Sequence, residues 1–138
     1  MTKRPTSAGF KRTRNDHACE TAEDYVEAID GMIAAHGECR VTQLADQFGV
    51  SHVTALKIVR RLERDGLTTT EVRKPIELTR KGKRLANRCR DRHDIVHRFL
   101  LAIGVSERMA AIDAEGIEHH VSPETLERMR NIAQSARP

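Results

Sequence analysis

Apolar residues recur at helical spacing in several stretches of the chain, and the first stretch lies between residues 19 and 38. Its apolar stripe consists of Tyr25, Ile29, Met32 and Ile33. Apolar positions three to four residues apart predict an amphipathic helix, with Thr21 as its N-cap and Gly37 at its end. Residues 1–20 are rich in basic side chains, and the chain before residue 19 shows no such period, so we expect a flexible basic arm there.

Two shorter helical patterns follow between residues 41 and 67, separated by Gly49. The first, which Thr42 is expected to cap, turns Leu44, Ala45 and Phe48 inward. The second, which Ser51 is expected to cap, has apolar residues at i, i+3, i+4 and i+7. These residues are Ala55, Ile58, Val59 and Leu62. Two short helices joined by a glycine-containing turn are typical of a helix-turn-helix unit.

The segment after the second helix has the composition of a small hairpin. Residues 68–72 are rich in threonine and valine and favour a strand, and residues 76–78 favour a second one. Lys74 and Pro75 between them suit a turn. A hairpin that directly follows a helix-turn-helix is expected to form a wing.

The rest of the chain has a helical pattern. We expect a long basic helix over residues 79–104, a second helix through His120 that Ser106 caps, and a third that Ser122 and Pro123 open. The predicted fold class is therefore mainly α: an N-terminal winged helix-turn-helix with a two-stranded wing over residues 21–80, followed by an all-helical domain over residues 81–138.

Composition restricts the class of protein. The chain has 138 residues, of which 3% are aromatic, and it contains no apolar run long enough for a membrane span and no secretory signal. Its three cysteines are far apart and form no C-x-x-C pair, which indicates reduced thiols and a cytoplasmic location. We therefore expect a soluble protein with no membrane partner.

Charge is distributed unevenly. Residues 79–103 carry eight basic and two acidic side chains, whereas residues 21–78 and 104–138 are net acidic. Basic and acidic blocks of this kind suggest a polyanion partner on one surface and cation binding on another. Solvated helix faces would explain the same pattern equally well.

The polar face of the second short helix carries side chains of the types that can contact DNA. With Thr42 and the wing tip, the candidate DNA-binding residues are Thr42, Ser51, His52, Val53, Thr54, Leu56, Lys57, Arg60, Arg61, Arg73 and Lys74. Serine, threonine, lysine and arginine reach phosphates and base edges, and exposed Val53 and Leu56 suit thymine methyl groups. The alternative is a helix-turn-helix fold used for protein contacts.

A second kind of chemistry lies near the C-terminus, in the stretch "DAEGIEHHVS". On a helix, Glu115, Glu118 and His119 share one face, whereas His120 is turned about 100° away. Two acids on one face repel each other unless a cation lies between them. A solvated glutamate- and histidine-rich helix is the plain alternative.

Four motifs, "EDYVEAI", "RHDIVHRFL", "IGV" and "DAEGIEHHVS", resemble the manganese transport regulators of the diphtheria toxin repressor family, which are metal-dependent bacterial transcription factors. The resemblance covers roughly residues 20–134. It implies a homodimer whose helical domain mediates dimerisation, a palindromic double-stranded DNA operator, and repression of manganese uptake genes when Mn²⁺ is bound. The implied metal ligands are Asp24, Glu27, His93, Glu115, Glu118 and His119.

Four carboxylates and two imidazoles form a hard donor set that suits Mn²⁺ or Fe²⁺, and six side chains suit two ions per subunit. His17 and Cys19 are not expected to reach a metal. Two alternatives remain: an iron-responsive repressor of the same family, and a metal-dependent hydrolase built on the glutamate and histidine cluster. The hydrolase lacks support because the sequence has neither a nucleophile motif nor a glycine-rich phosphate loop.

Overall fold

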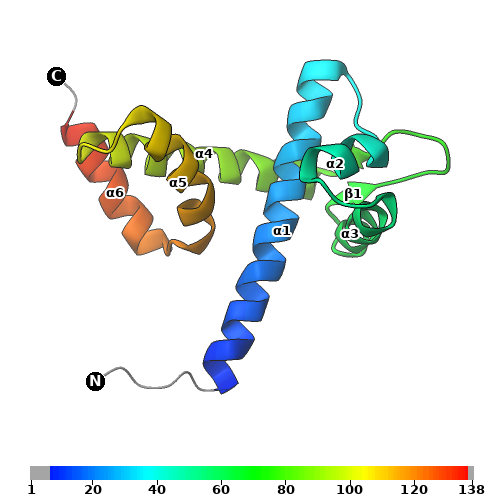
Figure 1. Cartoon of the computed structure of the whole chain (residues 1–138), viewed down its shortest axis with the longest axis horizontal. Coiled ribbons are helices and arrows are strands. Elements are labelled where there is room, and N and C mark those ends of the chain that lie inside the picture. Colours follow the sequence, from blue (N-terminus) through cyan, green and yellow to red (C-terminus); the bar gives the residue numbers. More distant parts are fainter. Residues whose placement is uncertain (1–6, 137–138) are drawn as a thin grey trace. The chain divides into compact units, whose positions relative to one another are not determined.

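The computed structural model describes residues 7–136, with side chains from residue 18 onward, and these residues are mostly helical (Figure 1). The elements in chain order are α1 (Ser7–His36), α2 (Val41–Phe48), α3 (His52–Arg64), β1 (Thr68–Thr69), β2 (Glu77–Leu78), α4 (Arg80–Ala102), α5 (Glu107–Ile117), the 3₁₀ helix η1 (Glu118–His120) and α6 (Pro123–Ser135). The predicted fold class is confirmed. No described helix combines the length and hydropathy that a membrane span requires.

The chain divides into two compact units, and the boundary between residues 87 and 88 lies inside α4. The first unit holds α2, α3, the wing and the part of α1 from residue 18 onward (Figure 1). Its core contains the predicted stripes of α1 and α3. The fully buried side chains that these helices and α2 contribute include Val26, Ile29, Leu44, Val59 and Leu62.

Ring stacking joins α1 to α2 in this core. The rings of Tyr25 and Phe48 have centroids 4.2 Å apart and planes within 6° of each other. Burial raises the pKa of the Tyr25 hydroxyl. Gly49, with φ of 64°, ends α2 in the left-handed conformation that the sequence predicts for a glycine at this position.

The wing is a two-stranded antiparallel sheet, in which Thr68 faces Leu78 and Thr69 faces Glu77. Its strands are shorter than predicted, because the chain from Thr70 to Pro75 forms a loop around a tight turn. In that turn the Lys74 amide donates a hydrogen bond to the Glu71 carbonyl over 3.1 Å. The turn therefore lies one or two residues earlier than the sequence indicated.

The first turn of α4 is attached firmly to the first unit. A Cβ added to Gly82 would collide with the carbonyl oxygen of Leu67, so only glycine permits this close approach. The Thr79 hydroxyl donates to the Gly66 carbonyl over 2.6 Å, and the Lys83 ammonium pairs with the buried Asp30 carboxylate at 2.5 Å. The start of α4 is thus part of the first unit.

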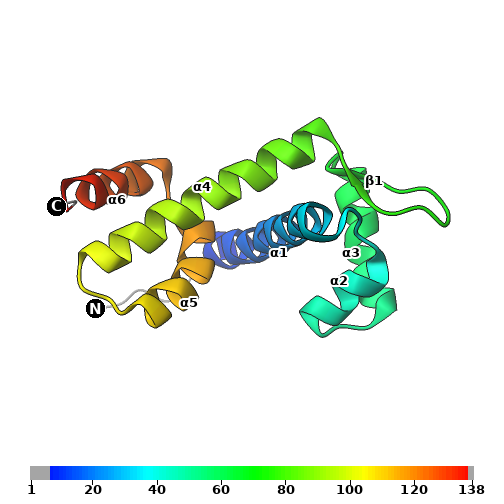
Figure 2. The same ribbon diagram turned by 90° about the horizontal axis from the view of Figure 1, so that it is seen from above.

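The second unit contains α4 from residue 88 onward, with α5, η1 and α6 packed against it (Figure 2). Its small core has four buried residues, Val96, Leu100, Ala110 and Ala114, against which α6 places Leu126 and Met129. The two caps predicted for this unit are confirmed. The Ser106 hydroxyl accepts a hydrogen bond from the Met109 amide, and the Ser122 hydroxyl accepts one from the Thr125 amide.

Four predicted boundaries are wrong. The first helix begins at Ser7 rather than after Thr21, and residues 7–20 were not predicted as helix because they have no amphipathic period. The part of the expected arm before Ser7 lies outside the described residues. Arg40 caps α2 in place of Thr42, since its amide donates to the Gln43 side chain over 2.7 Å. The long helix ends at Ala102 and leaves Ile103 half exposed, and α5 ends at Ile117.

Candidate nucleic-acid interface and metal centre

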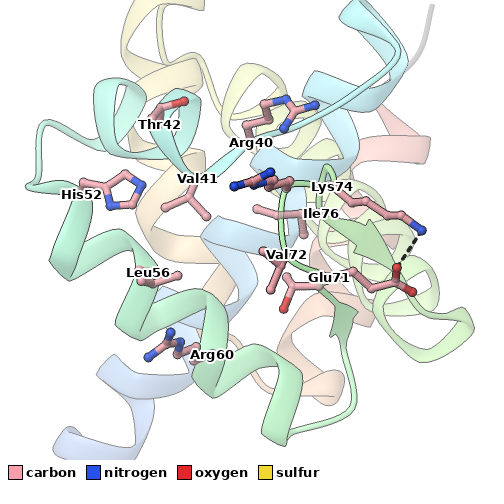
Figure 3. A pocket seen from close by; sticks show the side chains of 12 residues that line it. Arg40, Val41, Thr42, His52, Leu56, Arg60, Glu71, Val72, Lys74 and Ile76 are labelled. Carbon is pink, nitrogen blue, oxygen red and sulfur yellow. Dashed lines mark ion pairs between the residues drawn. The ribbon is translucent and has the colours of Figure 1, made fainter.

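A groove of about 570 Å³ separates α3 from the wing (Figure 3). Its lining residues come from the start of α2, from α3 and from the wing: Arg40, Val41, Thr42, His52, Leu56, Arg60, Thr70, Glu71, Val72, Arg73, Lys74 and Ile76. From α3 come His52, Leu56 and Arg60, which are four residues apart and therefore line the same side of the helix. Basic side chains outnumber the one acid, so the groove suits a polyanion.

The remaining candidates on α3 are exposed. Val53 has 61% of its surface exposed, which is unusual for a large apolar side chain on a polar helix face, and Lys57 and Arg61 are exposed too. Ser51 and Thr54 have a structural task in addition. The Ser51 hydroxyl accepts from the Thr54 amide over 3.1 Å and contacts its hydroxyl at 3.0 Å, so these two side chains close the start of the helix.

The wing tip places Arg73 and Lys74 in a constrained turn. Arg73 has φ of 64°, a conformation that costs a non-glycine residue of the order of 1 kcal/mol. Lys74 forms an ion pair with Glu71 at 2.7 Å (Figure 3), which offsets the negative charge that Glu71 would present to phosphates. Val72 between them is 90% exposed. Strain and an exposed apolar side chain at one tip are typical of a binding loop.

Two hydrogen bonds brace the wing against α3. The Glu63 carboxylate accepts from the Thr70 hydroxyl at 2.9 Å and from the Thr70 amide at 3.4 Å. Sequence patterns missed Glu63, as they missed Arg40 and Val72, because a short-range period does not show which side chains face a neighbouring loop. The brace fixes the width of the groove.

In the second unit the structure brings Glu118 and His119 together. Glu118 Oε1 lies 3.3 Å from His119 Nε2, and their side chains are 0% and 1% exposed. Both atoms belong to the donor types that Mn²⁺ and Fe²⁺ accept, and their separation is short enough for one ion to contact both. The pair lies in η1, where the tight backbone turns both side chains inward, rather than on the continued α-helix that the sequence predicted.

His93 and Glu115 form a second contact in the same unit. His93 Nδ1 lies 3.7 Å from Glu115 Oε1, so α4 and α5 each contribute one candidate ligand. His97 stacks on His93 with ring centroids 6.1 Å apart, and its Nε2 contacts Glu107 at 3.2 Å. Four of the six candidate ligands therefore belong to two close pairs in one unit.

The other two candidates, Asp24 and Glu27, lie in the first unit. They are one turn apart on α1 and are half-buried beside the core residues Tyr25 and Val26. Cys19, on the same helix, is exposed. Burial raises the pKa of the Cys39 thiol to about 11, so this sulfur is protonated near neutral pH and is a poor metal ligand.

Sequence reasoning also missed Arg92. Its Nε lies 3.3 Å from Glu118 Oε2, which gives the buried carboxylate a positive partner within the same unit. Glu118 is 26 residues away along the chain, and no local motif in the sequence signals a contact over that separation.

A winged helix-turn-helix with a basic groove, joined to a helical unit with one buried and one partly exposed pair of carboxylate and imidazole, defines a DNA-binding regulator of the metal-dependent class. The chain belongs to the iron dependent repressor family. The family's N-terminal DNA binding domain matches residues 17–76, and its metal binding and dimerisation domain matches residues 79–136. The two matches together cover most of the chain.

Individual relatives are similar over most of their length. The chain is 44% identical over 126 residues to the transcriptional regulator MntR of Escherichia coli O157:H7, which covers 91% of this chain and 81% of the relative. It is 36% identical over 112 residues to the HTH-type transcriptional regulator MntR of Bacillus subtilis, which covers 81% and 79%. These relatives are named as regulators of transcription and not as hydrolases.

Solved structures share the fold. One described as a manganese-dependent transcriptional repressor complex with manganese has a TM-score of 0.71 and 28% identity, over 82% of this chain and 52% of that one. The manganese regulator SloR has a TM-score of 0.71 and 24% identity, over 82% and 53%. The chain thus spans about half the length of these two solved proteins.

Proposed function

We propose that this protein is a manganese-responsive repressor that binds double-stranded DNA as a homodimer when Mn²⁺ is bound and thereby turns off manganese uptake genes. The observation that carries the proposal is the buried pair of Glu118 and His119, 3.3 Å apart, in the domain that the family describes as metal binding. The names of the MntR relatives support manganese as the signal. Because a regulator of this kind acts on chromosomal DNA, we propose a cytoplasmic location.

The proposed ligands supply oxygen and nitrogen donors. They are Asp24, Glu27, His93, Glu115, Glu118 and His119. Such a set favours a hard divalent ion, and six side chains suit two ions per subunit with bridging carboxylates. Fe²⁺ accepts similar ligands, and the family carries the name of iron, so an iron response is the second candidate. The resemblance favours manganese, because iron-responsive members of the family carry methionine and cysteine at the positions of Asp24 and Glu115, where this chain supplies oxygen ligands.

DNA is read by α3 and the wing. Helix α3 enters the major groove, where exposed Val53 contacts thymine methyl groups and Arg60 reaches phosphates or guanine edges. Arg73 at the wing tip lies over the backbone or the minor groove. A two-fold symmetric dimer requires a palindromic operator with half-sites about one helical turn apart, or a multiple of that distance.

Metal and DNA binding are coupled through the charges of the proposed ligands. Asp24 and Glu27 belong to the first unit, which contains α3 and the wing, and the other four ligands belong to the second unit. Without a cation, neighbouring carboxylates within each set of ligands repel one another, which opposes the arrangement of the ligands that binds DNA. A bound divalent ion supplies the positive charge that removes this repulsion. Coupling of this type is typically worth about 1–3 kcal/mol.

The test is a DNA-binding titration on a palindromic duplex selected from a randomised pool in the presence of Mn²⁺. Wild-type protein should bind at least about fivefold more tightly with Mn²⁺ than without metal. Glu118→Ala and His119→Ala should lose this difference while remaining folded dimers. Glu127→Ala, an exposed position on α6, is the matched control and should retain it. A full Mn²⁺ response in both ligand variants would reject the assigned site, and a response to Fe²⁺ alone would favour the iron alternative.

A further inference from the structure

The buried carboxylate of Glu118 uses its two oxygens for different partners. Oε1 faces His119 Nε2 at 3.3 Å, whereas Oε2 lies 3.3 Å from the Nε of Arg92. The Glu118 side chain is 0% exposed, so water cannot solvate its charge. An ionised carboxylate in such surroundings is stable only beside a compensating positive group.

Arg92 is suited to be that group. A guanidinium is charged at every accessible pH, so its compensation does not depend on solution conditions. The side chain is only 24% exposed, and its Nη2 lies 3.7 Å from the buried Cys89 sulfur one turn earlier on α4. Packing therefore restricts the guanidinium and directs its Nε to one oxygen of Glu118.

We propose that Arg92 is a positioning residue of the metal centre. It holds Oε2 of Glu118, so that Oε1 stays directed at His119 Nε2, and it gives the buried carboxylate a positive partner when no metal is present. The inference rests on the proposed metal-binding function of Glu118 and His119. It adds a residue outside the ligand set whose charge acts on the same carboxylate as the metal.

Two positive partners of one carboxylate are partly redundant. In the metal-free protein, loss of Arg92 leaves the Glu118 charge buried without this partner. In the metal-loaded protein, the divalent ion still compensates the carboxylate. Loss of the guanidinium should therefore destabilise the metal-free form far more than the loaded form, whereas loss of ordinary packing would destabilise both forms equally.

The experiment measures thermal unfolding of the full chain at one protein concentration, without metal and with saturating Mn²⁺. The test variant is Arg92→Met, which keeps most of the side-chain volume and removes the charge. Arg98→Met is the matched control on the same helix, because Arg98 forms an exposed pair with Asp94 at 3.2 Å. Both variants lose one arginine, so a general effect of net charge is common to them.

Arg92→Met should lower the metal-free Tm by about 10 °C, and Mn²⁺ should restore most of that loss. Arg98→Met should lower Tm by about 2 °C or less in both states. In a Glu118→Gln background, Arg92→Met should change the metal-free Tm little, because a neutral amide needs no counter-charge. Equal losses with and without Mn²⁺, or the same loss in the Glu118→Gln background, would overturn the proposal.

If Arg92→Met does not fold even with Mn²⁺, Arg92→Lys replaces it. Lysine keeps the charge and should therefore retain much of the metal-free Tm; a loss of about 10 °C in Arg92→Lys would contradict the charge argument. The failure of the proposed function has a different signature: wild-type protein would show no rise of Tm with Mn²⁺. A wild-type rise together with state-independent losses in Arg92→Met would contradict only the role of Arg92.

Discussion

Replacing Arg73 by glycine should separate the stability of the wing from its affinity for DNA. Arg73 has φ of 64° in the turn between Glu71 and Lys74, and this conformation costs a non-glycine residue about 1 kcal/mol. Glycine adopts it without steric strain but loses more backbone entropy on folding. The two effects oppose each other, so the free energy of unfolding of Arg73→Gly should stay equal or rise by up to about 1 kcal/mol.

DNA affinity should fall in the same variant. If the guanidinium of Arg73 neutralises one phosphate per subunit, its removal should reduce the slope of log K against log salt by about 0.9 per subunit. Fluorescence anisotropy with a labelled operator at several salt concentrations measures this slope, and urea unfolding measures the stability. Arg128→Ala on α6 removes the same charge in the other unit and should leave the slope unchanged. A slope equal to that of wild type in Arg73→Gly would refute the assignment of the wing tip to the phosphates.

Three further predictions concern parts of the fold that support the groove and its core. Glu63→Ala removes both hydrogen bonds that brace the wing and should weaken DNA binding about tenfold with little change of Mn²⁺ affinity. An equally large loss of Mn²⁺ affinity, measured by calorimetry, would contradict this prediction. Gly82→Ala should lower the free energy of unfolding, measured by urea titration, by about 1–3 kcal/mol. Gly31→Ala, in open space on α1, should raise it by up to about 1 kcal/mol. Equal effects of the two variants would reject the close contact at Gly82. The Cys39 thiol has a pKa raised to about 11 from its ordinary value of 9.0, so its protonated form stabilises the fold below pH 9 and this stability, about 2–3 kcal/mol, is lost as pH rises towards 11. In Cys39→Ala, the free energy of unfolding should fall less between about pH 9 and pH 11 than in wild-type protein. An equal fall in both proteins would contradict the role of the Cys39 thiol.

Local patterns predicted the helix-turn-helix because the sequence signals for it are short-range. The i, i+3, i+4 stripe of α3, the glycine after α2 and the serine caps depend on residues within one or two turns of each other, and the structure confirms them. The start of α1 was missed for the same reason. Residues 7–20 are helical without an amphipathic period, and a search for such a period does not detect this part of the helix.

The candidate metal centre was predictable only in part. The motif around Glu118 and His119 is local, but η1 replaces the last turn of the expected helix and changes which atoms meet. The partner Arg92 is distant in sequence, and its contact depends on how α4 packs beside η1. Which oxygen of a carboxylate faces which neighbour follows from tertiary packing, so the sequence could name the donor types but not their arrangement.

The central claim is that one set of side chains couples metal binding to DNA binding, and thermodynamic reciprocity tests it most directly. Calorimetry would measure the Mn²⁺ affinity of wild-type protein with and without operator, and anisotropy would measure operator affinity with and without Mn²⁺. We expect both ratios to be equal and to lie between about 5 and 150, and Glu118→Ala to bring both close to one. Ratios of one in the wild-type protein would show that metal binding and DNA binding are not coupled.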